Sequence, residues 1–124
     1  MANVLVVEDE EMVSDIIESL LKYLGHEPIV VQTGQEGIDT FRARSGFIDL
    51  VILDWILPGV GGAEVHDEIR KNRTNIPILI SSGYGTTDEI SERVGAIDGD
   101  GKTDFIPKPF TLAPLELKIA EMLS

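Results

Sequence analysis

Five residues with chemically useful side chains each stand at or just after the end of a short apolar run in the sequence. Three are carboxylates, one is an alcohol and one is an amine: Glu8, Asp9, Asp54, Ser82 and Lys108. If the apolar runs are parallel strands, their carboxyl ends lie at one edge of a sheet, where ligands bind in open α/β folds. The pattern therefore predicts a single crevice lined by these groups, suited to a divalent metal ion and a phosphoryl group.

The carboxylates predict a magnesium site. Neighbouring carboxylates repel one another, and a cation relieves that repulsion. Mg²⁺ prefers oxygen ligands, keeps several waters and commonly uses one or two carboxylates together with a phosphate oxygen. We expect Asp9 and Asp54 to bind Mg²⁺ directly and Glu8 to reach it through water. The backbone carbonyl of Ile56, turned inward by the loop, is the remaining expected ligand.

Asp54 is also the expected nucleophile, because a carboxylate can attack a phosphorus centre to form an aspartyl phosphate. Lys108 and the metal would neutralise charge on the transferring oxygens. The hydroxyl of Ser82 and nearby backbone N–H groups would hydrogen-bond the product. Ser81 competes for that role, but the Ser-Gly-Tyr spacing favours Ser82.

Alternating strand and helix signals indicate how these residues are positioned. Short apolar runs alternate with segments of helical period, which predicts strand-helix-strand units and a parallel sheet. The expected strands are residues 4–7, 28–31, 50–54, 76–81 and 104–107. Five helices are expected between and after them, marked by Met12, the Thr33 capping box, Val65, Thr86 and Thr111. Because strands 50–54 and 76–81 are continuously apolar, we expect both faces of the sheet to be covered.

Size and charge limit the classes of function. The chain has 124 residues, a formal net charge of −12 and no cysteine. That length fits one domain. Strong negative charge disfavours direct binding to nucleic acid or to an anionic membrane, and the lack of cysteine excludes disulfides and thiolate chemistry. With no basic leader and no apolar run that could span a bilayer, we expect a soluble cytoplasmic domain.

Taken together and in order, these motifs resemble those of the receiver domains of two-component response regulators, over essentially the whole chain. Glu8-Asp9 matches the acidic pair, Asp54 the phosphoacceptor, Ser82-Gly83 the switch hydroxyl with its small neighbour, and Lys108-Pro109-Phe110 the Lys-Pro-Phe motif. The resemblance implies a flavodoxin-like, doubly wound five-stranded sheet in the order 2-1-3-4-5 with five helices. It also implies a histidine kinase or histidine phosphotransfer protein as phosphoryl donor, and a cis Lys108–Pro109 peptide bond.

The resemblance further implies a conformational switch. Phosphorylation would draw the hydroxyl of Ser82 toward the phosphoryl group and turn inward the aromatic residue three positions before the lysine, here Phe105. Because Phe lacks a hydroxyl, the switch would act through packing, as a shift between two pre-existing arrangements. Ile56 and Tyr84 would border the path of attacking water, and we expect these bulky residues to slow loss of the phosphoryl group.

One segment departs from the family pattern. The Gly-Ala pair at 95–96 is normally followed closely by the fifth strand, but residues 97–103 intervene here. About four of them look inserted, judged against the short loops of α/β units. The segment adjoins a face that family members use for dimers and partners. A homodimer is therefore one option, and its geometry is open.

We expect residues 1–124 to be a single receiver domain without an output domain. It would act by contact with an unknown downstream protein, and would assist only its own phosphorylation and dephosphorylation without being an enzyme. An aspartyl-nucleophile phosphatase generally has a second Asp two positions after the first, where Ile56 stands. A flavin-binding module would place its phosphate beside the acidic run 8–11, which would repel it. A degenerate receiver that only binds proteins is disfavoured by the intact residue set.

Overall fold

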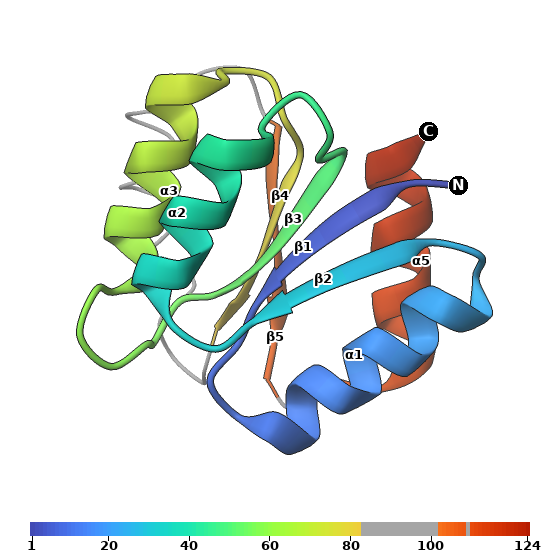
Figure 1. Cartoon of the computed structure of the whole chain (residues 1–124). Coiled ribbons are helices and arrows are strands. Elements are labelled where there is room, and N and C mark those ends of the chain that lie inside the picture. The colour runs from blue at the N-terminus through green and yellow to red at the C-terminus, as the bar shows by residue number, and fades with distance from the viewer. Residues whose placement is uncertain (83–101, 109) are drawn as a thin grey trace.

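The sheet of this protein is parallel and has helices on both faces (Figure 1). The computed structural model describes residues 1–82, 102–108 and 110–124. The strands are β1 (Asn3–Val7), β2 (Glu27–Val31), β3 (Leu50–Asp54), β4 (Ile78–Ser82) and β5 (Thr103–Pro107). All neighbouring strands pair in parallel, in the order β2-β1-β3-β4-β5. This confirms the predicted flavodoxin-like, doubly wound α/β fold.

Four helices lie in the described part of the chain: α1 (Glu11–Tyr23), α2 (Gly34–Arg44), α3 (Gly62–Asn72) and α5 (Leu112–Leu123). α2 and α3 cover one face of the sheet, and α1 and α5 cover the other (Figure 1). The fifth expected helix, at Thr86, lies outside the described residues, as do residues 97–101 of the expected insertion. Thr103, which was expected to belong to that insertion, is instead the first residue of β5 and pairs with Ile78.

The limits of β4 differ from the prediction at both ends. The strand begins at Ile78 and not at Ile76. Pro77 has no N–H to donate to a strand ladder, so it does not favour an earlier start. The strand continues through Ser82, whose carbonyl accepts a hydrogen bond of 2.7 Å from the N–H of Lys108. This bond ties the end of β4 to the segment that follows β5.

Gly25 follows the end of α1, and the start of α2 at the Thr33 capping box is as predicted. Gly25 has a φ of +86°, a conformation that glycine adopts at little cost, and its N–H donates to the carbonyl of Lys22 at 3.0 Å. At the start of α2, the hydroxyl of Thr33 accepts a hydrogen bond of 3.1 Å from the N–H of Glu36. Local sequence signals thus set these boundaries.

The sheet separates two apolar cores. Successive side chains of a strand point to opposite faces, so Leu5 and Val7 pack with α2 and α3, whereas Val4 and Val6 pack with α1 and α5. All five residues of β3 and all five of β4 are buried, as predicted for strands covered on both faces. This packing holds the carboxyl ends of β1 and β3 next to each other.

Candidate functional site

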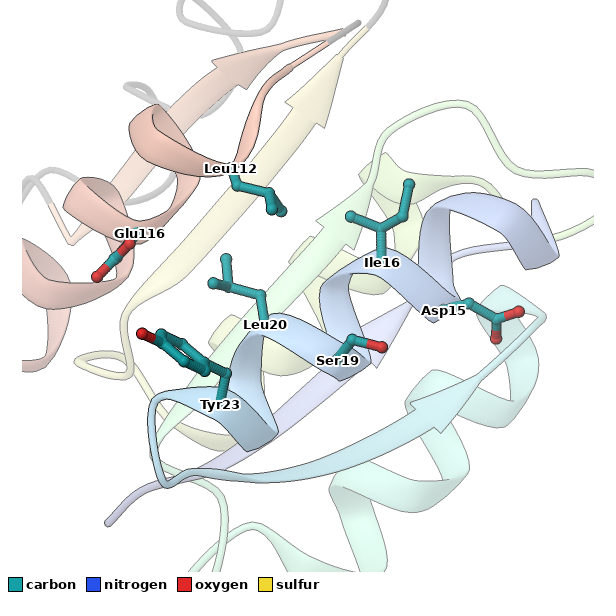
Figure 2. Close-up of a pocket in the computed structure, with 7 residues that line it drawn as sticks. All are labelled: Asp15, Ile16, Ser19, Leu20, Tyr23, Leu112 and Glu116. Atoms are coloured by element: carbon teal, nitrogen blue, oxygen red, sulfur yellow. The ribbon is translucent and has the colours of Figure 1, made fainter.

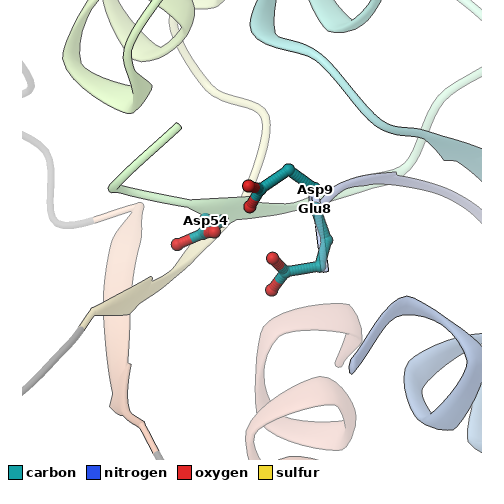
Figure 3. A group of neighbouring side chains, drawn as sticks. All are labelled: Glu8, Asp9 and Asp54. Atoms are coloured by element: carbon teal, nitrogen blue, oxygen red, sulfur yellow. The ribbon is translucent and has the colours of Figure 1, made fainter. Parts of the chain in front are cut away.

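Three carboxylates meet at the carboxyl edge of the sheet (Figure 3). Glu8 and Asp9 follow β1, and Asp54 is the last residue of β3. Because Val7 pairs with Leu53 in the register of these strands, the next residues along each strand come level. Carboxylate oxygens of Glu8, Asp9 and Asp54 all lie within 4.8 Å of one another. The predicted convergence of the acidic residues is therefore present.

Lys108 places a positive charge against this acidic group. Its Nζ lies 2.8 Å from Oε1 of Glu8 and 3.3 Å from Oδ2 of Asp54. A third carboxylate, that of Glu10, lies 3.7 Å away. The sequence analysis did not single out Glu10, because only the fold brings the segment after β5 against the start of α1.

Backbone N–H groups also fix two of the carboxylates. The N–H of Glu10 donates to Oε2 of Glu8 at 3.2 Å, and the N–H of Ile56 donates to Oδ1 of Asp54 at 3.3 Å. Each carboxylate is thus held by the residue two positions after it. Such local bonds are typical of Asp at turns, and here Glu8 makes one too, so that both side chains are oriented in the site.

Burial and neighbouring charge change the acidity of the pocket. The pKa of Asp54 is raised to about 7, first because the carboxyl is buried and then because of its hydrogen bond to, and repulsion from, Glu8. Lys108 opposes this increase. Burial alone would lower the pKa of Lys108, but its hydrogen bond to Glu8 and its attraction to Asp54 raise the pKa overall. Within the described residues, the pocket therefore sets three grouped carboxylates against one lysine.

These observations fit a hard divalent cation. The donors are all carboxylate oxygens, they lie close together, and a cation would relieve the repulsion that raises the pKa of Asp54. The two predicted direct ligands differ in exposure, since Asp9 is exposed and Asp54 is buried. Glu8, predicted to act through water, is buried and paired with Lys108. The role of the Ile56 carbonyl stays a prediction.

The loop after β3 is packed more closely than a flexible turn would be. A Cβ atom on Gly34, at the start of α2, would lie 2.2 Å from the carbonyl oxygen of Val60. A Cβ on Gly62 would lie 2.5 Å from Cα of Trp55. Only glycine tolerates such approaches, so these two residues fix the loop that carries Ile56. The contact of Gly34 was not predicted, because the two segments are distant in the sequence.

The predicted switch residues occupy the neighbouring strands. Ser82 is buried, and its Oγ has no hydrogen-bond partner among the described residues. Phe105 pairs with Ile80 in the sheet and packs, partly buried, against the core under α2 and α3. Of the proposed water-shielding pair, Ile56 is 64% exposed. Tyr84, the other residue of that pair, lies outside the described residues, and so does Gly83. Pro109 lies outside them as well, so the predicted cis Lys108–Pro109 peptide bond stays a prediction.

A groove of about 510 Å³ runs between α1 and α5 (Figure 2). It is lined by Asp15, Ile16, Ser19, Leu20, Tyr23, Leu112 and Glu116. Ile16 is 49% exposed and Leu112 is 51% exposed. α1 begins two residues after Asp9 and α5 begins four residues after Lys108. The two helices that line the groove therefore follow directly on the segments that carry the acidic site.

A family model described as the response regulator receiver domain matches residues 4–120. The uncharacterized transcriptional regulatory protein YkoG of Bacillus subtilis is 33% identical over 121 residues, which are 98% of this chain and 50% of that protein. The response regulator ArlR of Staphylococcus saprophyticus is also 33% identical, over 99% of this chain and 53% of its own length. The chain thus spans about half the length of these curated relatives.

Solved structures give the same likeness in three dimensions. A receiver domain protein from Clostridium thermocellum superposes with a TM-score of 0.88 at 26% identity, covering 99% of this chain and 94% of the other. Within the described residues, no helix is long and apolar enough to cross a membrane. The matches cover the strand ends described above, including Glu8, Asp54 and Lys108.

Proposed function

This chain belongs to the response regulator receiver domain family of two-component signalling, and from that premise we propose that Asp54 is its phosphoacceptor. The observation that carries the proposal is the position of the Asp54 carboxylate, which lies within 4.8 Å of the acidic pair and 3.3 Å from Lys108. Acids beside a nucleophilic carboxylate can hold a cation that activates it, and a nearby amine can stabilise the negative charge on the group being transferred.

The transfer step uses the carboxylate of Asp54 as the attacking group. One Oδ of Asp54 forms a bond to phosphorus while the bond from phosphorus to the donor's imidazole nitrogen breaks, and that nitrogen keeps the electron pair. Lys108 stabilises negative charge on the phosphoryl oxygens. Asp9 and Asp54, with Glu8 through water and the carbonyl of Ile56, are the groups that would hold Mg²⁺, which would neutralise further charge on those oxygens. The product is an aspartyl phosphate.

The proposed switch depends on a buried hydroxyl. The Oγ of Ser82 has no hydrogen-bond partner among the described residues, and a buried polar group without a partner favours any change that provides one. A phosphoryl oxygen on Asp54 would be such a partner. Phe105 lies on the neighbouring strand and is only partly buried against the core, so its ring is not fully enclosed. These features support a population shift on phosphorylation.

The proposed donor is a histidine kinase or histidine phosphotransfer protein, and we propose that one of its helices contacts the groove between α1 and α5. The apolar side chains Ile16, Leu20 and Leu112 would receive an amphipathic helix, while Asp15 and Glu116 at the groove favour basic residues beside it. The helices α1 and α5, which line the groove, follow directly on the segments that carry the site. A donor bound in the groove would therefore have its histidine near Asp54.

The remaining partners follow from the family and from charge. Response regulators act on downstream effectors. YkoG is named as a transcriptional regulatory protein and ArlR as a response regulator, and both are about twice as long as this chain. We propose that residues 1–124 act in the cytoplasm through protein contacts. Their net charge of −12 would repel the phosphates of nucleic acids and of anionic membranes, so we propose that they bind neither directly. Ile56, which replaces the second Asp of aspartyl phosphatases, supports a signalling acceptor over a turnover enzyme.

A small phosphodonor tests this proposal without any protein partner. Purified protein is incubated with Mg²⁺ and a small acyl phosphate, and intact mass is measured. The wild type should gain one phosphoryl group, and Asp54→Asn should gain none. Asp39→Asn is the matched control, because it removes the same charge from an exposed position on α2 and should leave the gain intact. A phosphorylated Asp54→Asn would contradict the proposal.

A further inference from the structure

A fourth carboxylate, that of Glu10, lies beside Lys108 but outside the group that would bind a cation. Oε1 of Glu10 is 3.7 Å from Nζ of Lys108. The carboxylates whose oxygens gather within 4.8 Å are those of Glu8, Asp9 and Asp54. Glu10 therefore contacts the amine of the site without being one of its candidate metal ligands.

Helix capping does not explain the side chain of Glu10. Glu10 is the N-cap residue of α1, yet its side chain makes no capping hydrogen bond. Its backbone does the local work, since its carbonyl accepts the N–H of Ser14 at 2.9 Å and its N–H donates to Glu8 at 3.2 Å. The side chain, 64% exposed, is left to contact Lys108.

Lys108 competes with any cation that enters the pocket. Its ammonium is 2.8 Å from Glu8 and 3.3 Å from Asp54, so it already neutralises two of the three grouped carboxylates. A divalent ion held by the same carboxylates would repel the ammonium. Lys108 would then be displaced from them, and within the described part of the chain Glu10 is the carboxylate outside the cation group that lies near enough to hold it.

We infer that Glu10 is a positioning residue that holds Lys108 when the grouped carboxylates of the pocket hold a divalent cation, and that it thereby raises the affinity of the pocket for that cation. This inference rests on the metal site proposed above. Without the charge of Glu10, the partners left to Lys108 among the described residues are Glu8 and Asp54, and Lys108 becomes a stronger competitor. At the exposed side of the site, loss of this contact should weaken cation binding about five-fold.

A double-mutant cycle tests the inference on the unphosphorylated protein. Mg²⁺ affinity is measured by titration calorimetry and by the fluorescence of Trp55 for Glu10→Gln, Lys108→Met and the double variant. Glu11→Gln is the matched control, because it removes an equal charge from the adjacent residue in the first turn of α1. With Lys108 present, Glu10→Gln should weaken Mg²⁺ binding about five-fold more than Glu11→Gln does. In the Lys108→Met background the two substitutions should have equal effects.

The outcomes separate this inference from the proposed function. Equal effects of Glu10→Gln with and without Lys108 would show that Glu10 acts only as a distant charge, and would overturn the inference while the metal site stands. A wild type that binds no Mg²⁺ would overturn the metal site itself, and the inference with it. Thermal denaturation of each variant establishes that it is folded at the titration temperature.

Discussion

The acidic pocket and the groove between α1 and α5 are neighbours that are built in opposite ways. In the pocket, Glu8 is 1% exposed and Asp54 is 4% exposed, and their charges are held by Lys108 and by backbone N–H groups. In the groove, apolar side chains such as Ile16 and Leu112 are about half exposed. Chemistry needs fixed charges in a site shielded from water, whereas recognition needs exposed apolar surface. In the proposed function, phosphoryl transfer therefore falls to the pocket and recognition of the donor to the groove.

The same chain segments connect the two regions. α1 follows the acidic pair directly, and α5 follows Lys108. A protein that binds in the groove would thus contact the two helices that follow the residues of the pocket. Substitutions in the pocket should affect every phosphodonor, and substitutions in the groove should affect only a protein donor.

The largest effect is expected for Lys108→Met in the pocket. The substitution removes the amine that would stabilise charge on the transferring oxygens, so the phosphorylation rate should fall roughly 10²–10³-fold. The decrease should be similar for a small acyl phosphate and for a phosphorylated protein donor. Intact mass followed over time measures both rates.

Lys118→Met is the control for that change. Lys118 lies on α5, and its Nζ is 2.8 Å from a carboxylate oxygen of Asp104, which is not one of the carboxylates of the acidic pocket. The substitution Lys118→Met removes the same charge as Lys108→Met and should leave both phosphorylation rates unchanged. A Lys108→Met protein that is slowed with only one donor would contradict the division of tasks between pocket and groove.

An intermediate effect is expected for Ile16→Glu in the groove. A charge buried in a helix-binding groove would reduce the binding free energy of the donor about as much as the loss of an interface hot spot does. Transfer from a histidine kinase or phosphotransfer protein should therefore slow roughly 10–100-fold. Phosphorylation by a small acyl phosphate should not change. The donor used is one that phosphorylates the wild type.

Phe47→Glu is the matched control for the groove. Phe47 is 50% exposed, like Ile16, but it lies in the loop between α2 and β3. The same change there should leave transfer from the protein donor intact. If Ile16→Glu slowed the small donor as well, the groove would not be separate from the chemistry.

The smallest effect is expected on stability, and it depends on pH. The folded protein raises the pKa of Asp54 from 3.8 to about 7, so the folded state binds this proton more tightly than the unfolded chain does. The stabilisation that this provides is complete below about pH 4 and is lost as the pH rises through about 7. Without Mg²⁺, Asp54→Asn should therefore gain free energy of unfolding over the wild type between about pH 5 and about pH 8, on the order of 1–3 kcal/mol.

Urea denaturation at both pH values measures this difference, and Mg²⁺ supplies the internal check. At a Mg²⁺ concentration about 100 times its dissociation constant, the wild type should gain about 2.7 kcal/mol of stability. Asp54→Asn should gain less, because it lacks one charged ligand. Parallel stability curves for wild type and Asp54→Asn from about pH 5 to about pH 8 would contradict the role of Asp54 in the pocket.

The sequence predicts the fold and the acidic group well because both follow from local patterns. β3 is bounded as expected at Leu50 and Asp54, since an apolar run covered on both faces ends at its first charged residue. Gly25 and Thr33 end and begin helices through signals contained within a few residues. The order of strands follows from the resemblance to receiver domains, and it brings Glu8 level with Asp54.

Contacts between distant segments are what the sequence does not predict. Glu10 meets Lys108 only because β1 and the chain after β5 end at the same edge of the sheet. Gly34 meets Val60 only because α2 packs beside the loop that precedes α3. Such contacts depend on tertiary packing, and no local signal in the sequence distinguishes these residues from ordinary loop and helix positions.

The most direct test of the account is to locate the phosphoryl group. Wild-type protein is treated with a small acyl phosphate, with Mg²⁺ or with a chelator, and the modified peptide is identified by tandem mass spectrometry. We expect one modified residue, Asp54, and no modification when the cation is chelated. A phosphoryl group on Ser82 or elsewhere, or equal modification of Asp54 with and without the cation, would contradict it.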